Sequence, residues 1–289
     1  MNLKIVVVGG VAGGATAAAK ARRENEHAEI TVFERGPFLS FANCGLPYFI
    51  GGEIPEREKL LLMTPDKFWE KYRITAKVNH EVVSITRHTK TVKVRTPDGT
   101  LLEVPYDKLI LSQGAAPIVP PLPGAKEDHV FVLRDIPNMD RIHKYLLEKK
   151  PATAVVIGGG FIGLEMAEAL MHRHAKVTII EKSPHILPLL DDDMAKELTR
   201  ALTHQGMAIV AGSGVTSIGK ADVTLEDGKK IAAEMVLLSI GVKPEVSLAR
   251  EAGLEIGPTG GVKANGRMES SDPDIYVAAS PEPMPQANI

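Results

Sequence analysis

The apolar positions of this 289-residue chain follow one strand–helix–strand pattern that occurs twice. Residues 3–8 are a continuous run rich in Val and Ile, which is typical of a parallel strand buried on both faces. An alanine-rich helix is predicted from about Gly13 to Glu24, followed by a second strand over residues 29–34. A glycine-rich turn joins the first strand to the helix. The pattern predicts one unit of a parallel α/β sheet.

The same order of elements recurs in the second half of the chain. Apolar runs at 154–158 and 176–181 flank a helical pattern at 163–174. Shorter β-like runs lie over 81–112 and 207–241, where Pro-Asp-Gly and Asp-Gly turns interrupt them. We therefore expect an α/β chain in which each unit has a parallel sheet and a small antiparallel β-meander.

Proline marks the predicted domain boundary and the end of the chain. The stretch 115–124 holds several prolines and predicts a stiff connection between two domains. One domain is expected to comprise 1–116 together with 250–289, and the other 117–249. Residues 281–289 carry proline at alternate positions and are predicted to form a poorly ordered tail.

Both predicted units carry a glycine-rich turn of the kind that binds dinucleotides. Its glycines permit a tight turn and a close approach to pyrophosphate, while the helix N-terminus supplies amide donors. The second turn fills all three glycine positions of this fingerprint: Gly158, Gly160 and Gly163. The first turn keeps Gly9 and Gly14 but has Val11 in the middle. Two such turns predict two Rossmann-like dinucleotide-binding domains.

Each unit also ends its second strand in an acid, Glu34 or Glu181, where a carboxylate would meet a ribose hydroxyl. Glu181 favours the free 2′-hydroxyl of NADH and repels a 2′-phosphate. Lys182 follows it and offers a charge that would accept NADPH, so the sequence favours NADH but leaves both open. The alternative is a pair of tight turns whose acids face solvent.

Composition and charge change this picture little. The chain is 44% hydrophobic and 24% charged, as in ordinary globular proteins, and its net charge of −2 indicates neither nucleic acid nor an anionic membrane. No apolar stretch approaches the roughly 20 residues that span a bilayer. The short apolar run at the start ends in glycines, unlike a signal peptide. We expect a soluble cytoplasmic protein.

Cys44 is the only cysteine, and it lies in Ser-Phe-Ala-Asn-Cys-Gly-Leu-Pro-Tyr at 40–48. No internal disulfide can form, so a partner sulfur must come from another molecule, and a lone thiol fits a reducing cytosol. The thiolate is the species that attacks a disulfide. Residues 44–50 can begin a helix at the cysteine, whose dipole would stabilise that anion. The alternative is an inert buried thiol.

Two further clusters are interpreted as structural. Three aspartates at 191–193 are predicted to open a helix over 194–204, where acids favour the N-terminal dipole. His172 and His174 lie two residues apart and do not share a helix face, which makes them a poor metal pair. We predict no metal site.

Three segments resemble coenzyme A-disulfide reductase, which belongs to the flavin-dependent pyridine nucleotide–disulfide oxidoreductases that use a single cysteine. They are Gly-Gly-Val-Ala-Gly-Gly-Ala-Thr at 9–16, the cysteine segment at 40–48, and Gly-Gly-Gly-Phe-Ile-Gly-Leu-Glu at 158–165. The similarity extends to about Tyr276. The cysteine segment is its most specific part.

The resemblance implies that the first turn binds FAD and that the second binds NADH or NADPH. Phe161 matches an aromatic residue that covers the flavin until nicotinamide displaces it, and Glu165 matches an acid beside the nicotinamide amide. The cofactor-binding residues that the resemblance implies are Gly9, Gly10, Val11, Ala12, Gly13, Gly14, Glu34, Arg35, Gly158, Gly160, Phe161, Ile162, Gly163, Glu165, Glu181, Lys182 and Gly241.

For the reaction, the resemblance implies that Cys44 is the redox nucleophile beside the flavin and forms a mixed disulfide with coenzyme A. Ser40 and Asn43 would touch the coenzyme A portion. Substrate contacts on the first helix are also implied: Thr16, Lys20 and Arg23. Their spacing places them on one helix face, which could meet anionic phosphates or simply be a solvated basic face.

The sequence departs from the family at two places. Ala279 and Ser280 stand where the family has a Gly-Asp pair that holds the flavin. The resemblance also implies a homodimer whose dimerisation domain forms the final part of the family's chain, and we expect this chain to lack that domain. These departures leave open a truncated, non-catalytic dinucleotide-binding remnant. A second alternative is an NADH oxidase or peroxidase in which Cys44 becomes a sulfenic acid. Oxidases and peroxidases of this kind carry a histidine where this chain has Ala12, which disfavours the peroxidase but leaves the oxidase open.

Overall fold

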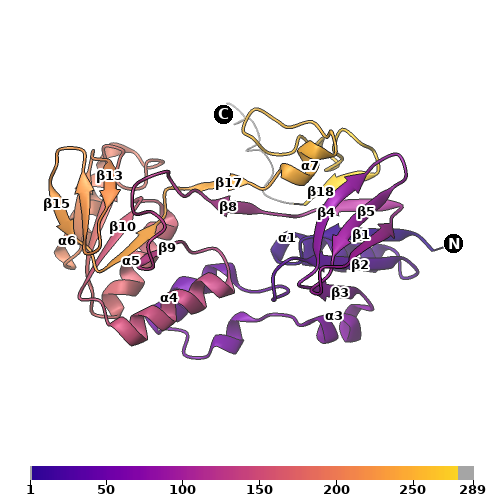
Figure 1. The fold of residues 1–289 in the computed structure, drawn as a ribbon, viewed down its shortest axis with the longest axis horizontal. Helices are drawn as coiled ribbons and strands as arrows, with labels where there is room; N and C mark the ends of the chain where they lie inside the picture. The colour runs from indigo at the N-terminus through magenta and orange to yellow at the C-terminus, as the bar shows by residue number, and fades with distance from the viewer. Residues whose placement is uncertain (1, 279–289) are drawn as a thin grey trace. The chain divides into compact units, whose positions relative to one another are not determined.

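The computed structural model describes residues 2–278, which form two compact units (Figure 1). Unit 1 holds residues 2–41, 61–116 and 243–278, and unit 2 holds Ala42–Leu60 and Pro117–Val242. Residues 281–289, predicted to be a tail, lie outside the described residues, as do Ala279 and Ser280.

The bounds of these units differ from the predicted domains at two places. Segment Ala42–Leu60, which carries the cysteine, groups with unit 2 because its helix packs on helices of that unit. Residues 243–249 group with unit 1, where the Glu245 amide donates to the Gly114 carbonyl at 3.0 Å. The cofactor that each unit binds stays a prediction.

Unit 1 is built on a five-stranded parallel sheet with the order β18-β7-β1-β2-β3. Its strands are β1 (Lys4–Val8), β2 (Glu29–Glu34), β3 (Thr75–Val78), β7 (Lys108–Leu111) and β18 (Ile275–Val277). Its helices are α1 (Ala12–Glu24), α3 (Pro65–Tyr72) and α7 (Ser247–Glu251). An antiparallel meander adds β4 (Glu81–Thr86), β5 (Thr91–Arg95) and β6 (Leu101–Pro105).

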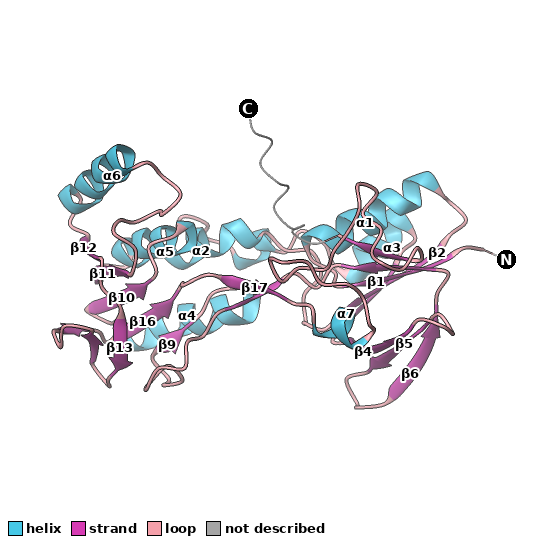
Figure 2. Cartoon of the chain, turned by 90° about the horizontal axis from the view of Figure 1, so that it is seen from above, coloured by secondary structure: helices cyan, strands magenta, loops and turns pink. Residues whose placement is uncertain are grey.

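The alternation of side chains along β1 fixes what covers each face of the unit 1 sheet. Ile5 and Val7 are buried with alanines of α1, whereas Val6 and Val8 are buried with β5 and α7. Successive side chains of a strand point to opposite faces, so both faces of β1 are covered. Figure 2 shows α1 and α3 on one side of this sheet and the meander on the other.

Unit 2 repeats this plan with the sheet order β12-β11-β10-β16-β9, again parallel throughout. Its strands are β9 (Val130–Phe131), β10 (Thr153–Ile157), β11 (Lys176–Glu181), β12 (Ala208–Ala211) and β16 (Met235–Leu238). Its helices are α2 (Leu46–Gly51), α4 (Ile136–Lys149), α5 (Phe161–His172) and α6 (Asp192–His204). The meander is β13 (Val215–Ile218), β14 (Asp222–Leu225) and β15 (Lys230–Ala232).

The predicted α/β class, with two Rossmann-like units that each hold a parallel sheet and a meander, is therefore confirmed. The chain passes between the units after residues 41, 60, 116 and 242. The last two of these passages lie in β8 (Ala115–Pro117) and β17 (Val242–Pro244), which pair with each other. The helix of the three aspartates begins at Asp192 with Asp191 as its N-cap. Among residues 2–278, no three potential metal ligands gather, and no helix has the length and apolar character to cross a bilayer.

The prediction that a helix begins at Cys44 is wrong. Cys44 lies in a short 3₁₀ turn, η1 (Asn43–Gly45), and α2 begins at Leu46. Pro47 explains this start, because proline has no amide hydrogen and its fixed φ suits the first turn of an α-helix.

Arg22 joins the C-terminal ends of α1 and α3 in unit 1. Its Nε donates to the carbonyl of Tyr72 and its Nη2 to that of Arg73, both at 3.0 Å, while Nη1 donates to Glu26 at 2.6 Å. These bonds satisfy carbonyls that have no partner within their helices. A single cation thus stabilises two helix ends.

Arg22→Met should lower the free energy of unfolding by about 1–2 kcal/mol, because the charge-assisted hydrogen bonds of the guanidinium are lost. The neighbouring Arg23 is exposed, so Arg23→Met is the matched control and should change stability by less than about 0.5 kcal/mol. Urea titration of the three proteins measures this difference. Equal midpoints for the two variants would contradict the role of Arg22.

Candidate functional site

The first glycine turn leads from β1 into α1, and two of its glycines are required by close contacts. Gly9 has φ +96°, and a Cβ there would lie 2.1 Å from the Ser112 carbonyl oxygen. A Cβ on Gly14 would lie 1.8 Å from the Gly9 carbonyl oxygen. Ser112, just after β7, also donates from Oγ to the Ala278 carbonyl at 2.5 Å. The turn is therefore enclosed by backbone.

The second turn, between β10 and α5, has the same geometry. Gly158 has φ +107°, and a Cβ there would lie 2.3 Å from the Ser239 carbonyl oxygen. A Cβ on Gly163 would meet the Gly158 carbonyl oxygen at 2.0 Å. Ser239 follows β16 as Ser112 follows β7. Sequence reasoning missed both serines, although Leu-Ser-x-Gly recurs at 111–114 and 238–241 and was an available signal.

Neither the backbone φ nor a neighbouring atom requires glycine at the middle position of the glycine turns. Val11 has φ −85° and Gly160 has φ −79°, and a Cβ on Gly160 would meet no atom within 4 Å. Both residues are the N-caps of their helices, and neither makes a side-chain capping bond in the described structure. The first amides of α1 and α5 are thus left for an anion, as phosphate binding at a helix N-terminus requires.

The acids at the ends of β2 and β11 are buried, so the alternative of solvent-facing acids is wrong. Glu34 accepts from the amides of Gly10 at 2.8 Å and Gly36 at 2.7 Å. Glu181 accepts from the amides of Gly159 and Ser183, both at 2.7 Å. A carboxylate has about four lone-pair sites, so each acid can still accept a ribose hydroxyl.

Each turn is closed from outside by the segment that follows its acid. The Ser40 amide donates to the Gly10 carbonyl at 2.9 Å, and the Leu187 amide donates to the Gly159 carbonyl at 2.8 Å. Ser40 and Leu187 both have positive φ, +44° and +46°. Positive φ is uncommon for residues other than glycine, so residues in the same strained conformation close the two turns.

The remaining predicted cofactor residues lie around these turns. Phe161, 64% exposed, and Ile162 stand at the start of α5, and Glu165 is half-buried one turn later. Lys182 is exposed beside Glu181. Arg35 forms an ion pair with Glu245 at 3.1 Å. Their cofactor contacts stay predictions, as do those of the exposed Ala12 and Gly13 and of Gly241, which has φ +113°.

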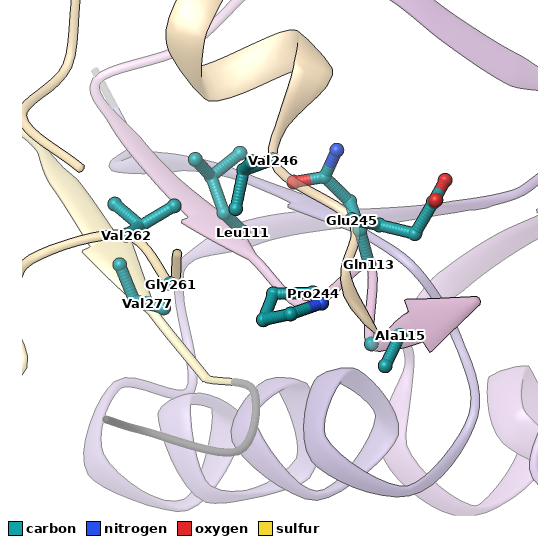
Figure 3. A pocket seen from close by; sticks show the side chains of 10 residues that line it. Leu111, Gln113, Ala115, Pro244, Glu245, Val246, Gly261, Val262 and Val277 are labelled. Carbon is teal, nitrogen blue, oxygen red and sulfur yellow. The ribbon is translucent and has the colours of Figure 1, made fainter. Parts of the chain in front are cut away.

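A pocket of unit 1 opens at the carboxyl ends of β7 and β18, where Leu111 and Val277 end their strands (Figure 3). Val246, Val262 and Val277 give it an apolar side, and Gln113 and Glu245 lie together on the other side. Ligands of open α/β sheets bind outside the carboxyl ends of the strands. The pocket has this location, although none of the predicted site residues lines it.

Cys44 belongs to unit 2 and is exposed, so the alternative of a buried inert thiol is wrong. Asn43, beside it in η1, is exposed as well. The three predicted contacts on α1, Thr16, Lys20 and Arg23, are all exposed on one helix of unit 1, where Lys20 pairs with Glu24. Each group is therefore accessible to a solute.

Helix α2, which follows the cysteine, is held by α4 and α5. Arg173 donates to the Ile50 carbonyl at 2.6 Å, and a Cβ on Gly51 would lie 3.2 Å from Ala169 Cα, so α2 and α5 approach closely. The Phe49 ring lies 4.8 Å from the His143 ring of α4. Burial, and then the charge of Arg173, lowers the pKa of His143, while Asp140 opposes this shift.

Comparison with known proteins gives a consistent result. The family model of the pyridine nucleotide-disulphide oxidoreductases matches residues 3–281, which is almost the whole chain. This chain belongs to that family. Its members use FAD together with a pyridine nucleotide, and two dinucleotide turns are the arrangement such a pair needs.

Individual relatives share much of the sequence. The chain is 36% identical over 274 residues to coenzyme A disulfide reductase of Staphylococcus haemolyticus, covering 94% of this chain and 62% of that protein. Reduced Bacillus anthracis CoADR-RHD is 45% identical with a TM-score of 0.93, over 96% of this chain and 50% of that one. A NAD-dependent persulfide reductase from A. fulgidus is 35% identical with a TM-score of 0.93, over 96% and 53%. This family member thus spans less than two thirds of each relative.

The glycines of the second turn provide a test of its geometry. Gly158→Ala should cost at least about 2 kcal/mol of stability, because it combines a positive φ with a backbone clash. Gly160→Ala, the matched control, should change stability by no more than about 1 kcal/mol, since its Cβ has open space. Thermal and urea unfolding measure both. A Gly158→Ala protein as stable as Gly160→Ala would contradict this geometry.

His143 makes the stability of unit 2 depend on pH. An unfolded histidine takes up a proton near pH 6.5, and the fold holds the pKa of His143 lower, so the unfolded state binds more protons as the pH falls below 6.5. Stability should therefore fall as the pH falls from about 7.5 to about 5.5.

His143→Gln should weaken that pH dependence, whereas His204→Gln, which changes an exposed histidine of α6, should leave it unchanged. Urea unfolding at the two pH values measures the difference. The idea fails if His143→Gln retains the full pH dependence of the natural chain.

Proposed function

We propose that this chain provides the two cofactor units of an FAD-dependent NAD(P)H:disulfide oxidoreductase that reduces coenzyme A disulfide through Cys44. The observation that supports this most is an exposed lone thiol in the same unit as a complete dinucleotide turn. A thiol with no second cysteine in the chain must exchange with an external sulfur. A reducing cytoplasm would keep it as a thiol.

The sulfur chemistry balances with one cysteine. The Cys44 thiolate attacks one sulfur of coenzyme A disulfide, which forms a Cys44–S–S–coenzyme A bond and releases the first coenzyme A thiolate. Two electrons and a proton then cleave the mixed disulfide, which restores the Cys44 thiolate and releases the second coenzyme A thiol. FAD, when bound, relays these two electrons from NADH or NADPH to sulfur.

The residues of the chain have distinct parts in this scheme. The open amides of α1 would bind the FAD pyrophosphate, and those of α5 would bind the nicotinamide nucleotide. Glu34 and Glu181 would accept a ribose hydroxyl while they hold their turns. Glu181 would repel a 2′-phosphate, so NADH is favoured, and exposed Lys182 is the residue that would accept NADPH.

Helix α1 supplies the candidate contacts to the substrate. Thr16, Lys20 and Arg23 form an exposed polar face that could meet the phosphates of coenzyme A, although Lys20 already pairs with Glu24. The similarity to a NAD-dependent persulfide reductase supports a second candidate, in which Cys44 takes sulfur from a persulfide. Both candidates use the same exposed thiol.

Incubation with coenzyme A disulfide should give a Cys44 adduct, because the thiol is exposed and unpaired with sulfur. Intact-mass spectrometry should show one coenzyme A per chain, because Cys44 is the only cysteine. Cys44→Ser should give none. Addition of FAD and NADH should then remove the adduct. A natural chain that remains unmodified would contradict the proposed substrate.

Parallel incubations separate the alternatives. A small persulfide that modifies Cys44 faster than coenzyme A disulfide does would favour the persulfide reductase. A sulfenic acid formed with peroxide and turned over by NADH, without any disulfide reduction, would favour the oxidase or peroxidase.

A further inference from the structure

The segment from Gly52 to Leu60 follows α2 and returns the chain toward the cysteine. Most of its side chains are exposed; only Ile54, Arg57 and Leu60 are even partly buried. Few contacts order an exposed segment of this kind, so the loss of any one of them should increase its motion. It ends in a 3₁₀ turn, η2 (Arg57–Leu60).

The buried end of this segment packs directly on the cysteine turn. A Cβ on Gly45 would lie 2.6 Å from Leu60 Cδ2 and 3.5 Å from Ile54 Cδ1, so both side chains rest on the residue after Cys44. The Ala42 amide also donates to the Leu60 carbonyl at 2.9 Å. Leu60 thus supports η1 from both sides of the thiol.

Arg57 connects this support to α4. Its Nε and Nη2 donate to the two carboxylate oxygens of Asp140, each at 2.7 Å, in a bidentate pair. The pair raises the pKa of Arg57. Its two side chains are 27% and 41% exposed, so it is a small term in global stability. The pair has a larger effect on geometry, because two parallel hydrogen bonds between a planar guanidinium and a carboxylate fix the orientation of η2 on α4 as well as its distance.

We propose that Arg57 and Asp140 are positioning residues for Cys44, which hold η2 on α4 and, through Leu60, hold the thiol in the orientation that disulfide exchange requires. The proposal rests on the proposed role of Cys44 as the nucleophile. Attack on a disulfide needs the three sulfur atoms aligned, and a bulky disulfide such as that of coenzyme A can reach such alignment only if the attacking thiol is held.

The test compares two reagents on the sole cysteine. Iodoacetamide is small and needs little alignment, whereas coenzyme A disulfide needs a held thiol. Arg57→Gln and Asp140→Asn should each lower the ratio of the coenzyme A disulfide rate to the iodoacetamide rate about tenfold. The double variant should do no more than Arg57→Gln alone, since Arg57→Gln already removes the contact with Asp140. Arg57→Lys should restore part of the ratio.

The matched control is Arg95→Gln, because Arg95 of β5 pairs with Glu81 at the same 2.7 Å on an exposed surface far along the chain from the cysteine. It should leave the ratio unchanged. Deuterium exchange gives a second readout: residues 42–60 should exchange faster in Arg57→Gln than in the natural chain or in Arg95→Gln.

The outcomes distinguish this inference from the proposed function. If the natural chain forms the coenzyme A adduct and Arg57→Gln keeps the ratio within about twofold, the positioning role is overturned while the function stands. If the natural chain forms no adduct, the proposed substrate fails. In that case deuterium exchange decides, and equal exchange of residues 42–60 in Arg57→Gln and Arg95→Gln overturns the positioning role.

Discussion

A buried carboxylate at the end of the second strand organises each half of this protein. Glu34 and Glu181 each accept one amide from the glycine turn and one from the segment after the strand, so a single side chain joins three pieces of backbone. An amide buried without an acceptor is costly, and a buried carboxylate needs donors, so each group satisfies the other. The conformation of each glycine turn, which leaves the first amides of α1 or α5 accessible, depends on the two hydrogen bonds that its acid accepts.

The segments that follow the two acids begin alike but lead to different structures. After the acid, Ser40 and Leu187 return to their glycine turns with matching backbone bonds and positive φ. At the same spacing beyond them stand Cys44 in the first half and Asp191, the N-cap of α6, in the second. One copy of the repeat thus ends in an exposed thiol and the other in a helix start. The cysteine segment packs with unit 2 although it follows the unit 1 turn in sequence.

Local patterns predicted most of the framework. The strand at 29–34 and the strand at 176–181 have the expected bounds, because buried parallel strands leave continuous apolar runs. The α-helix after the cysteine begins two residues later than predicted, since Pro47 and not Cys44 determines its first turn. Contacts between distant residues left no local signal: the Arg57–Asp140 pair and the packing of α2 on α5 depend on tertiary structure alone. The serines behind the glycine turns had a signal, the repeated Leu-Ser-x-Gly, that sequence reasoning did not use.

The proposed reaction requires the two turns to hold different cofactors at once, and a visible spectrum tests this most directly. The chain is mixed with FAD, freed of excess, and titrated with NADH in the absence of oxygen. We expect a yellow protein with flavin absorbance that bleaches as NADH is added, since electrons pass from one site to the other. A colourless chain that FAD cannot reconstitute, or a bound flavin that NADH leaves oxidised, would contradict the proposed reaction.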